Sequence, residues 1–280
     1  MPGHGNQEGR LTILLLSMTA LSGLVDAVSI LRLGHVFVAN MTGNVVLLAV
    51  ALTGPPGLRM SLPLVALAGF LFGGLVGGQI YLRRHRRRRR WLTTVMAVQT
   101  VLMAGALVST ALWLDRGGLA QEGIGLAGRA PPGDAGMSGA AGDGPLDLGR
   151  HLVTSLLAVA MGVQHATARR LARPDIPTNV LTTALTGLVI DSRLGGGAGS
   201  RPRRLLAPVT MFAGALTGAA ALLYVHLLVP LGAGLLLTAA GLVGAATGRL
   251  PGPEEPARPG PAPDPGQPPG PRDAPGPPAS

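Results

Sequence analysis

The stretch "HVFVANMTGNVVLLAVALTG", residues 35–54, is apolar enough to enter a membrane but does not have the pattern of a simple span. Asn40, Thr42 and Asn44 lie in its first half, and a Gly-Pro-Pro sequence follows its end. Side-chain amides and non-helical backbone survive at membrane depth only where protein or a watery cavity satisfies their hydrogen bonds. We therefore expect residues 37–53 to form a short, polar-tipped segment that enters a bundle of helices.

The composition of the whole chain is typical of a helical membrane protein. Of its 280 residues, 47% are hydrophobic and 13% are charged, whereas charged residues make up about 25% of an average soluble domain. The mean hydropathy is +0.41. Between the charged clusters lie apolar runs long enough for a membrane-spanning helix, which needs roughly 20 residues. These features predict an all-α integral membrane protein.

We expect about six membrane-spanning helices and a second short segment at residues 176–190. The expected spans are residues 11–31, 62–82, 91–114, 148–168, 205–228 and 229–247. They form two membrane regions, 11–114 and 150–250, which are flanked and separated by an N-terminal tail at 1–10, a Gly/Ala-rich loop at 115–149 and a Pro-rich tail at 251–280. We interpret the first apolar run as an uncleaved helix, because further spans follow it.

The distribution of arginines along the chain predicts its topology in the membrane. All 23 basic residues are arginines, and cytoplasmic loops carry the basic excess. If both short segments return to the side from which they enter, 16 arginines of the two membrane regions and the N-terminal tail lie on one side and five on the other. Eight full spans would place one basic cluster on the wrong side. We therefore expect both termini in the cytoplasm, and a net charge of +10 that reflects topology rather than nucleic-acid binding.

The two membrane regions resemble each other. A shift of 139 residues matches Gly23 with Gly162, Ala27 with Ala166 and Asn40 with Asn179, and it places Asp26 against His165. At a shift of 141, "GGLVG" (73–77) aligns with "GALTG" (214–218). Since each region would contain three spans, an odd number, the two would face in opposite directions. This predicts a 3+3 inverted repeat, a recurring design of secondary transporters.

Polar side chains inside the apolar segments are the candidates for a solute or ion path. They are Asp26, Asn40, Thr42, Asn44, Gln164, His165, Thr178 and Asn179. A carboxylate within a membrane helix costs at least about 2.5 kcal/mol and usually marks such a path. The alternative is that Asp26 caps the loop that follows its helix, or pairs with Arg32.

For His165, a proton relay with Asp26 requires both side chains to face one cavity. The alternative is a histidine near the cytoplasmic interface, beside Arg169. The amides and threonines have an alternative role as well, since hydrogen bonds between membrane helices also hold helices together.

Four glycines have the spacing of a close helix contact: Gly73, Gly77, Gly214 and Gly218. We expect them to pack helices, including helices of the two membrane regions against each other, and a homo-oligomer interface is the alternative. The chain has no cysteine, no metal-ligand spacing of histidines and none of the common catalytic motifs. We therefore expect neither enzymatic activity nor a cofactor.

The segments "GLVDAVSILRLGHVFVANMTGN" and "AMGVQHATARRLARPDIPTNVLTTALTG" resemble the YoaK-like family, bacterial membrane proteins of unknown function. The resemblance covers about residues 11–248 and implies a multi-helix inner-membrane protein, without a substrate or catalytic residues. In this family the position of His165 is commonly Asn, which weighs against a proton relay shared by all members.

Three functions follow from these patterns. The first is a secondary transporter or channel for a small solute or ion, built around the polar residues above. The alternative is a non-transporting scaffold or regulator that acts through its basic loop or its Pro-rich tail. An intramembrane enzyme would have only Asp26 and His165 as candidate groups.

Overall fold

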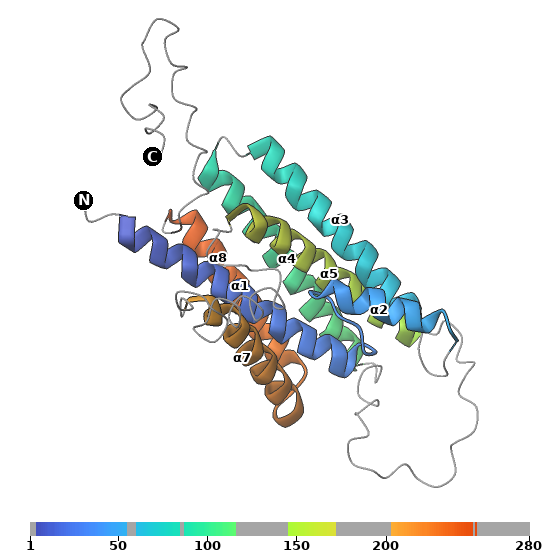
Figure 1. Ribbon diagram of the computed structural model, residues 1–280. Helices are drawn as coiled ribbons and strands as arrows, with labels where there is room; N and C mark the ends of the chain where they lie inside the picture. Colours follow the sequence, from blue (N-terminus) through green and yellow to red (C-terminus); the bar gives the residue numbers. More distant parts are fainter. Residues whose placement is uncertain are drawn as a thin grey trace, which may run out of the picture.

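A computed structural model describes residues 4–54, 60–84, 87–115, 145–171, 203–248 and 250. In these residues every regular element is an α-helix, and the long helices lie side by side in an elongated bundle (Figure 1). The helices are α1 (His4–Arg32), α2 (Met41–Ala51), α3 (Ser61–Arg84), α4 (Arg88–Asp115), α5 (Pro145–Leu171), α7 (Arg203–Tyr224) and α8 (Leu228–Ala246).

Five of these helices are long and apolar enough to cross a membrane. They contain the segments Gly9–Arg32, Ser61–Arg84, Arg89–Trp113, Leu206–Tyr224 and Leu228–Ala246. Their outward faces carry large apolar side chains, among them Phe72, Val101, Phe212 and Leu236, each more than half exposed. Such an outer surface suits hydrocarbon rather than water. The expectation of an all-α, multi-pass membrane protein is confirmed.

The helix α5 is not among the five, although we expected a span at residues 148–168. It begins at Pro145, a residue that suits the first helical position because its missing N–H is not needed there. None of the residues 153–168 is exposed, since α5 packs against α1, α3 and α4. Its polar side chains therefore meet other helices rather than lipid, which explains its lower hydropathy.

The helices α1 and α7 cross in parallel at glycines. A Cβ at Gly214 would overlap the carbonyl oxygen of Ala20, and one at Gly218 would lie 2.9 Å from the carbonyl oxygen of Leu24. From Gly214 to Gly218 on α7, the contact on α1 moves from Ala20 to Leu24, so the two helices run in the same direction. Only glycine permits this approach of one backbone to the other.

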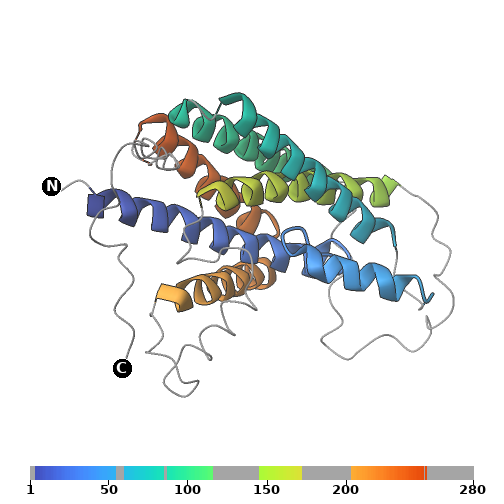
Figure 2. The ribbon, with the colours of Figure 1, turned by 45° about the horizontal axis from the view of Figure 1, so that its top comes forward.

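The helices α3 and α5 form a second parallel crossing. A Cβ at Gly73 would overlap the carbonyl oxygen of Val159, and one at Gly77 would lie 2.8 Å from the Cβ of Ala166. Figure 2 shows the two crossings on different sides of the bundle, with α7 against α1 on one side and α3 against α5 on the other. Each crossing joins a helix of residues 11–114 to a helix of residues 150–250.

The other contacts fix the remaining directions. Along α8 the contacts run in reverse order to those along α1 and α4: Gly234 lies beside Leu21 and Met103, and Gly241 lies beside Leu14 and Met96. Between α4 and α5 the order is also reversed, since Gln99 bonds Gln164 whereas Gly105 lies beside Leu156. In the described part of the chain, α1, α4 and α7 thus run one way, and α3, α5 and α8 run the other.

Because the long helices alternate in direction, the end of α5 and the start of α7 lie at the same end of the bundle. The end of α3, the start of α4 and the end of α8 lie there too, and Arg89 donates a hydrogen bond to the carbonyl oxygen of Ala246. Most described arginines belong to this end, which we call the arginine end: Arg10, Arg83, Arg84, Arg87, Arg88, Arg89, Arg90, Arg169, Arg170, Arg203 and Arg204. Arg32 and Arg150 belong to the opposite end.

The first short segment is only partly helical. We expected residues 37–53, and α2 spans Met41–Ala51, preceded by a non-helical loop at residues 33–40. The chain leaves α1 through a left-handed turn, with φ of 102° at Gly34 and 58° at His35. This reversal brings the loop back along α1. Gly43 then leaves room for the ring of Phe37 to pack directly on α2.

Several expectations concern other parts of the chain. The second short segment at 176–190, with Thr178 and Asn179, lies outside the described residues, as do residues 116–144 of the Gly/Ala-rich loop and the Pro-rich tail. At the N-terminus, α1 begins at His4, so part of the expected tail at residues 1–10 is helical.

Candidate functional site

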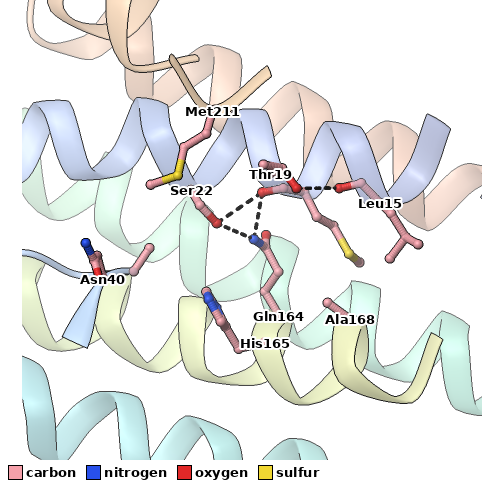
Figure 3. A pocket seen from close by; sticks show the side chains of 10 residues that line it. Leu15, Thr19, Ser22, Asn40, Gln164, His165, Ala168 and Met211 are labelled. Atoms are coloured by element: carbon pink, nitrogen blue, oxygen red, sulfur yellow. Dashed lines mark hydrogen bonds between the residues drawn. The ribbon is translucent and has the colours of Figure 1, made fainter. Parts of the chain in front are cut away.

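A cavity of about 100 Å³ lies between α1 and α5, beside the loop that precedes α2 (Figure 3). The polar residues that line it are Thr19, Ser22, Asn40, Gln164 and His165. Met211 of α7 is one of its apolar lining residues. Thr19 and Ser22 flank the middle of the apolar segment Gly9–Arg32. The cavity therefore lies at mid-depth of α1, where hydrocarbon would surround a helix that had no neighbours.

Gln164 joins three helices in the wall of this cavity. Its amide nitrogen donates hydrogen bonds to the carbonyl oxygen of Met18, at 2.9 Å, and to the hydroxyl oxygen of Ser22, at 3.0 Å. Its amide oxygen accepts a hydrogen bond from Nε2 of Gln99, at 2.5 Å. Gln99 and Gln164 are both buried. A buried network with each amide hydrogen-bonded makes the position of α5 against α1 and α4 specific.

His165 occupies the next position on α5. Its Nδ1 lies 3.0 Å from the carbonyl oxygen of Met161, and its ring stands edge-on to Phe70 of α3, with 5.1 Å between the ring centroids. When Nδ1 carries the proton and donates a hydrogen bond to the carbonyl oxygen of Met161, Nε2 is left as the hydrogen-bond acceptor of the ring. The hydrogen bond to Met161 and the ring contact with Phe70 hold the imidazole of His165 in one orientation at the cavity wall.

Asp26 does not belong to the cavity wall. It is buried one turn beyond Ser22, and its Oδ1 accepts hydrogen bonds from the backbone N–H groups of Val38, at 2.9 Å, and Ala39, at 2.7 Å. These contacts correspond to the alternative in which Asp26 caps the loop after its helix. Asp26 is not among the described lining residues of the two cavities that His165 lines, so the described part of the chain gives no support to a proton relay between them.

The second oxygen of Asp26, Oδ2, is buried and has no hydrogen-bond partner among the described residues. The carboxylate therefore uses one oxygen to fix the loop and retains acceptor capacity on the other.

The three polar residues of the opening stretch take different positions. Asn44 is buried and clips the loop, because its Oδ1 accepts a hydrogen bond from the N–H of Phe37, at 2.9 Å, and its Nδ2 donates one to the carbonyl of the same residue, at 2.5 Å. Asn40 lines the cavity. Thr42 is exposed and does not face it. Of the three, only Asn40 is placed to meet a solute.

Comparison with known proteins shows the family to which the chain belongs. Residues 14–248 match the family described as "Protein of unknown function (DUF1275)". The chain belongs to this family. It is also similar to the "UPF0700 transmembrane protein YoaK" of Bacillus subtilis (strain 168), with 31% identity over 180 residues, which are 63% of this chain and 64% of the relative. The chain thus matches just under two thirds of the length of that relative. The expected likeness to a YoaK-like family is confirmed, and no solved structure matches the chain.

Three polar residues of the site were not among the candidates that the sequence indicated: Thr19, Ser22 and Gln99. Gln99 had a usable signal, because it is the one amide in the apolar helix α4. Thr19 and Ser22 had no usable signal, since a hydroxyl in a membrane helix can donate a hydrogen bond to the backbone of its own helix. Thr19 donates to Leu15 O and Ser22 to Met18 O, and only the approach of α5 reveals their second role.

Proposed function

We propose that this protein is a secondary transporter or channel of the bacterial cell membrane, and that its small solute passes through the cavity between α1 and α5. The observation that carries the proposal is a cavity walled by hydroxyl, amide and imidazole groups at mid-depth of an apolar bundle. Polar groups in that position are costly, and in membrane proteins they commonly line substrate or ion paths.

The chemistry of the wall limits the solute. The polar groups of Thr19, Ser22, Asn40 and Gln164 are uncharged, and each can donate or accept a hydrogen bond. The volume of about 100 Å³ is small beside the several hundred Å³ of a typical organic-ligand pocket. A small polar solute, or an ion that sheds part of its water, fits this wall better than a large or multiply charged molecule.

We also propose six spans arranged as a 3+3 inverted repeat. Exchanging α1 with α5, α3 with α7 and α4 with α8 converts the α1/α7 crossing into the α5/α3 crossing, and both crossings are built on glycines that the repeat aligns. The partners exchanged in this way run in opposite directions. The loop and α2 are then the half-helix of the first repeat, and residues 176–190 are its counterpart.

The arginine end is the cytoplasmic end in this proposal, because loops rich in arginine remain in the cytoplasm. Both termini then lie in the cytoplasm, and the loop before α2 enters the bundle from outside. The cavity lies where that loop meets the middle of α1, so a solute would approach it past Asn40.

Solute flux tests the proposal. Purified protein in liposomes is mixed with small polar solutes and ions in turn, and shrinkage and swelling are followed by light scattering. We expect at least one solute to enter faster than in empty liposomes, and Thr19→Leu, which fills the cavity, to abolish the gain. Thr217→Leu is the matched control, because Thr217 also bonds the carbonyl four residues before it but lies exposed on the outside of α7.

Two results would overturn the proposal. One is flux of every solute at the level of empty liposomes, and the other is equal flux through the Thr19→Leu and Thr217→Leu proteins. If the protein conducts nothing, and its cellular role disappears on deletion of residues 251–280, it acts as a scaffold instead.

A further inference from the structure

A second pocket, larger than the first, lies between α3 and α5 toward the arginine end. It has a volume of about 690 Å³, and Phe70, Gly74, Gly78, His165, Arg169 and Arg170 are among its lining residues. We propose that this pocket binds an anionic phospholipid, with the phosphate on the guanidinium groups of Arg169 and Arg170 and an acyl chain along Gly74 and Gly78. The proposal does not depend on whether a solute passes through the first cavity.

Two glycines of the pocket, Gly74 and Gly78, have open space where a side chain would begin, unlike the third, Gly162, which packs closely against α3. A Cβ at Gly74 or at Gly78 would meet no atom within 4 Å, whereas Gly73 and Gly77, one position earlier, are needed for the contact with α5. The helix α3 thus carries two sets of glycines on adjacent faces. The first set is explained by the crossing with α5, and the second leaves open space in the wall of the pocket.

This open space faces the surroundings of the bundle. Gly74 and Gly78 lie in one stripe of α3 with Leu71, Leu75 and Leu82, at the three- and four-residue spacing of a helix face. These three leucines are 63%, 60% and 61% exposed. In a membrane, the stripe would face lipid tails, and the glycines would form a shallow groove in it that an acyl chain can fill.

The groove leads to a cluster of positive charge. Gly78 lies six residues before Arg84, the end of α3, which corresponds to roughly 9 Å along the helix axis. Arg169 and Arg170, on the last turn of α5, are exposed there. The guanidinium carbon of Arg170 lies 4.2 Å from the ring centroid of Tyr81, so that cation–π contact fixes it beside α3.

No carboxylate of the two helices balances this charge. The helix α3 contains no aspartate or glutamate, and α5 contains none after residue 147. Two guanidinium groups bind a phosphodiester through charge-assisted hydrogen bonds. Basic pockets between membrane helices on the cytoplasmic side are suited to anionic lipid headgroups. A second copy of this chain is a poorer occupant, because a symmetric contact along the stripe would bring the arginine ends of two copies together.

Native mass spectrometry of the detergent-purified, full-length protein tests the proposal. Phosphatidylglycerol is titrated against phosphatidylcholine, and inorganic phosphate is added in a third series. We expect one phosphatidylglycerol to bind with high preference over phosphatidylcholine, and phosphate to leave that complex intact. Since each arginine near a lipid surface contributes to binding, the Arg169→Gln/Arg170→Gln protein should lose affinity by roughly tenfold or more.

Matched variants separate the pocket from general effects. Gly78→Leu should weaken binding by blocking the groove, whereas Gly232→Leu should not, since Gly232 is a helix glycine of α8 with equally open space at its Cβ position. Arg87→Gln/Arg90→Gln removes the same charge at the same end of the bundle and should bind as the wild type does.

Three results would overturn the proposal. The first is equal phosphatidylglycerol binding by all variants, which would indicate non-specific adducts. The second is displacement of the lipid by inorganic phosphate, which would indicate a site for a free anion. The third is a dimer without bound lipid that Gly78→Leu converts to a monomer, which would assign the groove to a second copy of the chain.

Discussion

Asp26 and Asn44 hold the same short loop from two different helices. Asp26 accepts hydrogen bonds from the N–H groups of Val38 and Ala39, and Asn44 pairs with both backbone groups of Phe37. Non-helical backbone at membrane depth requires such partners, because hydrocarbon offers no hydrogen bonds to replace them. Asp26 and Asn44, two of the candidate path residues, therefore bind the backbone of the loop, and Asn40 at the end of the loop lines the cavity.

This assignment predicts the effect of truncating Asn44. In Asn44→Ala the N–H and the carbonyl of Phe37 lose their partners, so we expect the free energy of unfolding to fall by about 2 to 4 kcal/mol. Thermal unfolding of the purified protein in detergent would show a lower midpoint. Thr42→Ala is the control, since Thr42 is exposed two residues away. Equal midpoints for the two variants would contradict the role given to Asn44.

The sequence alone does not reveal these roles, for a physical reason. The loop reaches Asp26 only because the chain reverses at Gly34 and His35, and the positive φ at His35 is unusual for a residue with a side chain. The network of Gln99, Gln164 and Ser22 likewise depends on how α4, α5 and α1 meet. Spacing in the sequence marks polar residues but does not say which of them bond to each other.

Glycines of α3 and α7 allow pairs of helices to pack closely. The spacing of Gly73 with Gly77 and of Gly214 with Gly218 is visible in the sequence and typical of close packing. The sequence does not show which helix each glycine pair contacts. Glycine spacing predicts that another helix packs closely there, but it does not identify that helix. In the structure, a Cβ at Gly73 would overlap Val159 of α5, and a Cβ at Gly214 would overlap Ala20 of α1.

Neighbouring glycines of α3 should respond in opposite ways to alanine. Gly73→Ala forces a methyl group into the backbone of Val159, so we expect a clear loss of stability, of about 1 to 3 kcal/mol. Gly74→Ala meets open space and removes a residue of low helix propensity, so stability should stay equal or rise by up to about 1 kcal/mol. Unfolding midpoints of the two proteins give the comparison. Equal destabilisation by both substitutions would contradict the α3/α5 crossing.

Considered as a whole, the molecule is a bundle whose long helices alternate in direction, with most described arginines at one end. Hydropathy predicted the spans well where helices face lipid. It described α5 least well, because a helix surrounded by protein need not be apolar on all sides. The alternation places the end of α5 and the start of α7 at one end of the bundle, as a returning segment between them requires.

The proposed topology predicts which positions a membrane-impermeant thiol reagent reaches from each side. The native chain has no cysteine, so single cysteines report without background. We expect label from outside at Arg59→Cys and Gly136→Cys, and label only from inside at His85→Cys, Ser192→Cys and Ser280→Cys. Label from outside at Ser192→Cys would mean that the second short segment crosses the membrane, and the inverted repeat would fail.

The central claim is that water, and with it a solute, reaches the cavity between α1 and α5. The most direct test is the reaction of Ser22→Cys with a small, charged thiol reagent in intact membranes, compared with Ala160→Cys in the core of the bundle and with the exposed Thr53→Cys. We expect Ser22→Cys to react as Thr53→Cys does, while Ala160→Cys stays unmodified. If Ser22→Cys is as inert as Ala160→Cys, the cavity is closed to water and the transport proposal is contradicted.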